Sequence, residues 1–192
     1  LWTLFCVSLA TLFAAWLFWR FGTRVGLEFT TGYLIEYALS VDNLFVFLVV
    51  FSYFGVPAQH QHRVLFWGIL GALVLRAVFI VLGAALLARF QLMIYIFGAF
   101  LLVTGIKLLA AREIEVEPEK NPMLRLVRRF LPVTPAYHGH HFLVRLDGRL
   151  FATPLLLVLV VIEATDVVFA VDSIPAIFAI TRDPFIVFTS NI

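Results

Sequence analysis

Long runs of apolar residues recur along this chain, and their length constrains the fold more than any other feature. A helix needs about 20 apolar residues to cross the roughly 30 Å hydrocarbon core of a bilayer. Five runs approach or exceed that length and a sixth begins near Phe185: 1–19, 29–54, 64–88, 90–110, 150–180 and 185–192. The sequence therefore predicts an all-α, polytopic transmembrane helix bundle that forms a single domain over residues 1–192.

Composition agrees with a surface that mostly contacts the lipid bilayer. The chain is 62% hydrophobic and 14% charged, whereas a soluble domain carries about 25% charged residues. The first run has no small-residue cleavage site of the kind that ends a signal peptide. We therefore expect it to be a membrane span.

The polar stretch 111–149 separates the fourth and fifth runs. Seven basic residues lie in it: Arg112, Lys120, Arg125, Arg128, Arg129, Arg145 and Arg149. By the positive-inside rule this loop is cytoplasmic, although Arg20 and Arg24 then lie on the outer side. Runs 29–54 and 150–180 would cross the membrane in opposite directions.

Within this loop, residues Met123–Leu131 have apolar residues at helical spacing and three arginines between them. One interpretation is a short amphipathic helix whose arginines meet anionic lipid headgroups. The other is a plain solvated connector.

Acidic residues inside the apolar runs are the strongest functional signal. Run 29–54 contains Glu36 and Asp42, and run 150–180 contains Glu163, Asp166 and Asp172. Each costs about 3 kcal/mol at the centre of a spanning helix. Clustered like charges in a low dielectric need protons or a cation. Oxygen ligands suit magnesium, calcium or manganese, and no His, Cys or Met accompanies these acids. Manganese is the expected ion, with calcium as an alternative.

The two acidic segments also resemble each other. Glu36–Asn43 and Asp166–Ser173 superpose at an offset of 130, each with an acid, five residues, a second acid and a small polar residue. A repeat in two helices of opposite direction is typical of inverted-repeat transporters, which bind substrate where the repeats meet. We therefore predict an inverted repeat.

Helix geometry restricts which of these acids can point into the same site. Positions six residues apart are about 240° apart around a helix, so Glu36 and Asp42 do not share a face. Either the acids serve two neighbouring sites or their helices are kinked. Pro175 favours a break, because it cannot donate to the carbonyl group of Val171. The predicted metal ligands are the five acids and two neutral oxygen donors: Glu36, Asp42, Asn43, Glu163, Asp166, Asp172 and Ser173.

An alternative explanation is that the acids pair with Arg76, which lies in the middle of run 64–88 and would hold helices together. One arginine cannot neutralise five carboxylates, so a mixed arrangement, in which Arg76 gates an emptied site, is also open. The histidines lie outside the acidic runs. His60 and His62 lie at the edge of run 64–88 beside Arg63. The three loop histidines could sense or collect metal or simply be solvated: His138, His140 and His141. Glycines within the runs are expected to be points of close helix packing: Gly68, Gly71, Gly83, Gly98 and Gly105.

Several classes of function have no support in the sequence. There is no phosphate-binding loop, nucleotide fingerprint or Ser/His/Asp set, so we expect neither an enzyme nor a bound cofactor. The single cysteine, Cys6, permits no disulfide within the chain. A net charge of +2, with the cations gathered in one loop, argues against a nucleic-acid partner.

Three segments resemble the TerC/Alx family of bacterial integral membrane proteins: residues 31–47, 62–76 and 163–176. The resemblance implies a multi-pass protein of the bacterial inner membrane, with a helix before residue 1 and further helices after residue 192. Carried onto this chain, the family motif selects the same seven ligand residues.

The family is named for tellurium resistance, and members similar to Alx are associated with manganese export. The resemblance therefore implies a manganese exporter. A membrane scaffold of a tellurite or metal stress-response complex, without transport activity, is the alternative. Carboxylates would repel the tellurite anion, so any resistance is expected to be indirect.

Overall fold

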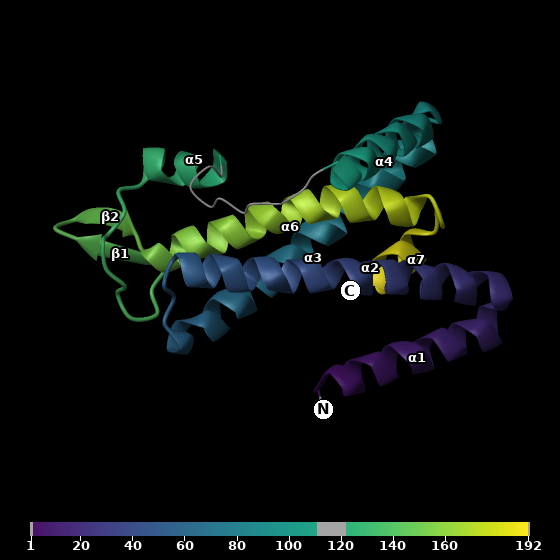
Figure 1. Ribbon diagram of the computed structural model, residues 1–192, viewed down its shortest axis with the longest axis horizontal. Coiled ribbons are helices and arrows are strands. Elements are labelled where there is room, and N and C mark those ends of the chain that lie inside the picture. The colour runs from purple at the N-terminus through teal and green to yellow at the C-terminus, as the bar shows by residue number, and fades with distance from the viewer. Residues whose placement is uncertain (1, 111–121, 192) are drawn as a thin grey trace. The chain divides into compact units, whose positions relative to one another are not determined.

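A computed structural model describes residues 2–110 and 122–191 of the chain (Figure 1). Four helices there are long and apolar enough to cross a membrane: α1 (Trp2–Phe21), α2 (Thr23–Tyr53), α3 (Ala58–Arg89) and α6 (Pro154–Phe178). Two shorter helices, α4 (Leu92–Ala110) and α7 (Pro184–Asn191), coincide with the two remaining apolar runs. The prediction of an all-α membrane protein is confirmed, apart from one small hairpin.

Two of these helices are longer than the bilayer requires. Helix α2 has 31 residues and α3 has 32, which correspond to about 46 to 48 Å at the usual helical rise. A hydrocarbon core of roughly 30 Å cannot cover that length. Their ends therefore extend into the headgroup region or beyond it.

The chain divides into two compact units. Unit 1 consists of Leu1–Ser40, Arg76–Leu108 and Val171–Ile192, and unit 2 of Val41–Leu75 and Leu109–Ala170. The boundaries fall inside α2, α3 and α6, so each of these helices contributes one part to each unit.

Close helix packing organises unit 1. Leu17, Phe29 and Ile186 form a core in which α1, α2 and α7 meet, and none of them is more than 2% exposed. A Cβ atom at Gly32 would lie 2.7 Å from Ser190 Oγ, so α2 and α7 are in close contact. Small residues at such points let helix backbones approach one another.

Unit 2 has the larger apolar core. It includes Val50 from α2, Val64 from α3, and Leu155 and Val158 from α6, all fully buried. The end of α2 thus packs with the start of α6. In unit 1 the start of α2 meets the end of α6, where the Thr181 hydroxyl donates to Glu28 Oε2 at 2.6 Å.

The structure describes the polar stretch before α6 from residue 122 onward, and residues 111–121, with Arg112 and Lys120, lie outside the described part. Helix α5 (Pro122–Phe130) agrees with the helical one of the two interpretations of this segment. Leu124, only 1% exposed, joins the core of unit 2. Strands β1 (Leu143–Leu146) and β2 (Arg149–Ala152) then form an antiparallel hairpin that we did not predict.

A two-residue turn closes this hairpin. Its residues, Asp147 and Gly148, have φ angles of 48° and 77°. Both angles are positive, as a type I′ turn requires, and Asp-Gly is a favoured sequence for it.

The acid-bearing helices are not interrupted. Helix α6 continues through Pro175 to Phe178, so the break expected at Pro175 is absent. Pro175 still cannot donate to the carbonyl oxygen of Val171, and the helix ends three residues later.

Candidate functional site

In unit 1, Glu36 of α2 is held in a buried polar cluster. Arg76 of α3 donates from Nη1 to Glu36 Oε1 and, at 2.8 Å, to Asn191 Oδ1. The amide of Asn191 in turn donates to Glu36 Oε2 at 2.9 Å. Glu36 and Arg76 are each 8% exposed and Asn191 is 5% exposed. Both oxygens of Glu36 are therefore satisfied by protein groups.

For Glu36, one of the five acids, the structure therefore agrees with the alternative explanation that the acids pair with Arg76. A buried carboxylate paired with a guanidinium and a further amide avoids most of the cost of an isolated charge. Sequence reasoning missed Asn191, whose only signal was a polar side chain at the end of an apolar run.

Asp172 and Ser173 also belong to unit 1. Thr104 of α4 hydrogen-bonds the half-buried carboxyl group of Asp172. Ser173 is 2% exposed, and its buried Oγ has no hydrogen-bond partner within residues 2–110 and 122–191.

In unit 2, Glu163 and Asp166 lie three residues apart on α6 and so project from the same side of the helix. The two carboxyl groups interact electrostatically. Asp166 is 5% exposed. Oε2 of Glu163 is buried and lacks a hydrogen-bond partner in the described part of the chain.

The backbone of α3 packs directly against this carboxylate. A Cβ atom at Gly71 would overlap the carboxyl group of Glu163 and lie 2.7 Å from its Oε2. Only a residue without a side chain fits there. Gly71 thus brings α3 close to Glu163 without offering it a hydrogen-bond donor from a side chain.

Asn43 of α2 is the third predicted ligand in unit 2. Its side chain is 9% exposed, and no described group hydrogen-bonds its buried Oδ1. The side chain of the neighbouring Asp42 lies outside the described residues. The predicted ligands of unit 2 therefore include two oxygen atoms that are buried and unsatisfied by described protein groups.

Burial matches at two positions of the predicted repeat. The first acids of the two segments, Glu36 and Asp166, are 8% and 5% exposed, and the closing polar residues, Asn43 and Ser173, are 9% and 2% exposed. The match does not extend to every position, because Ser40 is exposed whereas its equivalent, Ala170, is 1% exposed. The inverted repeat stays a prediction.

The described residues contain no group of three or more His, Cys, Asp or Glu side chains close enough to hold a metal ion. That search does not include Asp42. Unit 1 brings Glu36 to Arg76 and Asp172 to Thr104, and unit 2 brings Glu163 to Asp166. A single metal site built from all seven residues stays a prediction.

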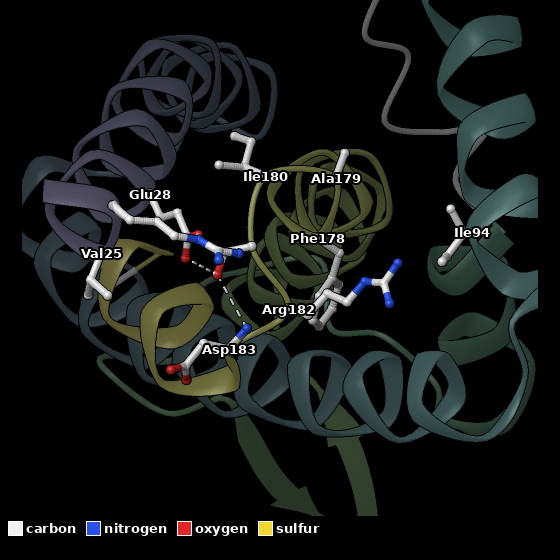
Figure 2. A pocket seen from close by; sticks show the side chains of 10 residues that line it. Val25, Glu28, Ile94, Phe178, Ala179, Ile180, Arg182 and Asp183 are labelled. Atoms are coloured by element: carbon white, nitrogen blue, oxygen red, sulfur yellow. Dashed lines mark hydrogen bonds and ion pairs between the residues drawn. The ribbon is translucent and has the colours of Figure 1, made fainter. Parts of the chain in front are cut away.

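A pocket of about 630 Å³ in unit 1 adds polar residues that the sequence did not single out (Figure 2). It lies where α2 and α4 begin, α6 ends and α7 begins. Glu28 on its wall accepts hydrogen bonds from Thr181 and, at 2.9 Å, from Arg24. Arg182 and Asp183 line it as well. The pocket therefore offers charged groups of both signs.

Apolar helices of spanning length, two of which carry buried carboxylates, define an integral multi-pass membrane protein. The sequence profile of the integral membrane protein TerC family matches residues 21–192, and the chain belongs to this family. No solved structure matches it.

Named relatives come from bacteria and a plant. An uncharacterized membrane protein of Myxococcus xanthus is 58% identical over the whole chain, which spans 60% of that protein. Alx of Escherichia coli K12, named as a candidate membrane-bound redox modulator, is 51% identical, and the chain spans 62% of it. The chloroplast thylakoid membrane protein TERC of Arabidopsis thaliana is 47% identical over 97% of the chain and 49% of that protein. The chain thus spans about three fifths of its bacterial relatives.

Proposed function

We propose that this chain forms part of an exporter of divalent cations, with manganese as the substrate and calcium as the alternative ion. The observation that supports the proposal best is the environment of Glu163. Its Oε2 is buried inside a spanning helix, and the described residues give it no hydrogen-bond donor. A carboxylate in such a place is costly unless a cation or a proton meets it.

The donors around Glu163 in unit 2 favour a hard cation. Asn43 of α2 and Asp166 of α6 provide oxygen atoms, and Asp42 directly precedes Asn43 in the sequence. Magnesium, calcium and manganese prefer carboxylate and carbonyl oxygens, whereas copper and zinc are better served by sulfur or imidazole. In this proposal, Asp172 and Ser173 are further oxygen donors in unit 1.

Arg76 has a separate role in the proposal. Its guanidinium neutralises Glu36 inside unit 1, much as a bound cation would. A metal ion that reached Glu36 would compete with Arg76 for the same carboxylate oxygens. Arg76 would then hold Glu36 while the ion is absent and release it when the ion arrives.

The proposed location is the bacterial inner membrane, with loop 111–149 in the cytoplasm. The pocket at Glu28 would then lie at the outer ends of its helices, because it is built from the start of α2 and the residues after α6. Neither an enzymatic activity nor a bound cofactor is part of this proposal.

The experiment is transport of manganese by the full-length protein in liposomes. Glu163→Gln keeps the shape of the side chain and removes its charge, so manganese flux should fall by about tenfold or more. Asp147→Asn is the matched control, because it makes the same chemical change in the hairpin turn, where asparagine tolerates the positive φ. Equal flux in the wild type and Glu163→Gln would reject the proposal.

A membrane scaffold for a stress-response complex is the second candidate. It is favoured by the folding of residues 122–152 into α5 and the hairpin, which gives the polar stretch a defined surface for a partner. In this candidate, a redox role of the kind named for Alx would act through such a partner. Replacing the exposed arginines of α5 with alanine (Arg125, Arg128 and Arg129) leaves the core of unit 2 intact. This change should abolish the function of a scaffold, whereas a transporter should keep ion flux.

A further inference from the structure

Two histidines that are 80 residues apart in sequence meet in unit 2. Nδ1 of His60, at the start of α3, lies 3.0 Å from Nδ1 of His140, in the turn before β1. Their rings are nearly perpendicular, with centroids 4.7 Å apart and an angle of 82° between the planes. His60 is 5% exposed, whereas His140 is exposed. The pair is thus anchored on one side and open to solvent on the other.

Neighbouring groups fix the buried ring. Gln59 Nε2 lies 3.3 Å from Nε2 of His60. The ring of Tyr137 stacks on His60 with centroids 6.1 Å apart, and the Tyr137 hydroxyl donates to the carbonyl oxygen of Phe54 at 2.7 Å. Outer contacts of this kind orient a metal-binding imidazole through the nitrogen that does not face the metal.

The facing nitrogens cannot both carry a proton at this distance, because two N–H groups would point at each other. At least one of them therefore presents a lone pair. Two nitrogens that bind one metal at about 2.0 to 2.1 Å lie about 2.9 Å apart at a right angle and about 3.4 Å apart at the tetrahedral angle. The observed separation of 3.0 Å falls within this range, so both imidazoles can bind one ion with little movement.

We propose that His60 and His140 form a binding site for a borderline divalent transition metal, of which zinc is the representative, with water in the remaining positions. Imidazole suits zinc, nickel and copper better than it suits manganese or calcium. The site is therefore distinct in ligand chemistry from the carboxylates of α2 and α6. It does not depend on the proposed transport function.

Binding would have a structural consequence within unit 2. The ion would connect the start of α3 to the segment that leads into the β1–β2 hairpin. Gln59 can adapt by rotating its amide, so that its oxygen accepts a hydrogen bond from the Nε2–H group of His60 once Nδ1 binds the metal. The nearby Arg63 is directed to the ring of Phe142, 5.5 Å from its centroid.

Zinc binding to the full-length protein, purified without a histidine tag, tests this site. His140→Ala should weaken zinc binding at one site by about tenfold or more, and the exposed residue can be removed without opening the core. His62→Ala is the matched control, since His62 is an exposed imidazole on the same turn of α3 but outside the pair. Excess manganese should not displace the zinc.

Two results of the zinc-binding measurement would overturn the proposal. One is zinc affinity in His140→Ala equal to that of the wild type. The other is an equal loss in His140→Ala and His62→Ala, which would indicate diffuse binding to surface imidazoles. If the pair serves only as a hydrogen bond, His140→Ala would lower the unfolding temperature by the same amount with and without zinc, and this too would contradict a metal site.

Discussion

Arg76 and Glu36 form a buried ion pair that joins the middle of α3 to the middle of α2, and Asn191 hydrogen-bonds both side chains. Both charges lie in spanning helices, where each alone would be costly. The pair therefore affects the stability of the protein, and it also occupies the carboxylate for which the proposed ion would compete.

Arg76→Met removes the countercharge and leaves Glu36 buried. Breaking such a pair usually costs about 3 to 5 kcal/mol, so we expect a lower unfolding temperature and poor membrane expression. Adding Glu36→Gln to this variant should recover much of the loss, because no unpaired charge then remains. Thermal unfolding in detergent measures both effects, and a double variant no more stable than Arg76→Met would contradict this account of the pair.

Gly71→Ala tests the contact between α3 and Glu163. The new methyl group would overlap the carboxyl group, and overpacking of this kind costs about 1 to 3 kcal/mol. Gly98→Ala in α4 is the matched control, since a Cβ atom there meets nothing within 4 Å, and it should be neutral or slightly stabilising. Combining Gly71→Ala with Glu163→Ala should relieve the overlap. Equal stability of the two single glycine variants would show that α3 does not approach Glu163 closely.

Helix α5 is expected to lie at the membrane surface. Met123, Leu126 and Phe130 are 50%, 49% and 74% exposed on one side, and Arg125, Arg128 and Arg129 lie on another, which is typical of interfacial helices. After Cys6→Ser, a spin label at position 130 should be more accessible to oxygen than a label at position 125. The label at 125 should be more accessible to a water-soluble nickel chelate. Identical aqueous accessibility at both positions would place α5 in solution.

Because of Tyr137, the stability of unit 2 should fall at alkaline pH. Burial raises the pKa of Tyr137 above its usual value, which is about 10 in model peptides. Since the folded pKa is the higher one, its stabilising contribution is complete below pH 10 and is lost as the pH rises through the folded pKa. Tyr137→Phe should therefore weaken the fall in stability above pH 10.

The same substitution removes the hydrogen bond to Phe54 and should cost about 1 kcal/mol at neutral pH. Unfolding followed between pH 8 and pH 12 separates the two effects. Parallel curves for the wild type and Tyr137→Phe would mean that Tyr137 is ionised equally easily in both states.

The helices could be predicted from sequence because bilayer thickness sets their length, and α5 because its apolar residues recur at helical spacing. The hairpin was missed, although Asp147-Gly148 is a favoured turn sequence, since the flanking strands are only four residues long. Three glycines expected at close contacts, Gly68, Gly71 and Gly83, do meet neighbouring side chains. At Gly98 and Gly105, a Cβ atom would have no atom of the described residues within 4 Å.

The partners of the acids could not be deduced in the same way. Glu36 and Asn191 are 155 residues apart, and no local pattern specifies which polar side chains such distant segments bring together. The break predicted at Pro175 failed for a related reason. A single missing hydrogen bond near the end of α6 does not outweigh the packing of the surrounding residues, several of which are fully buried.

The most direct test is a structure of the full-length protein with manganese, recorded at the manganese absorption edge. The account predicts an anomalous peak in coordination contact with the carboxyl group of Glu163, which would satisfy its buried oxygen. A well-ordered Glu163 whose oxygens are both bonded to protein donors, with no peak beside it or beside Asp166, would contradict the account.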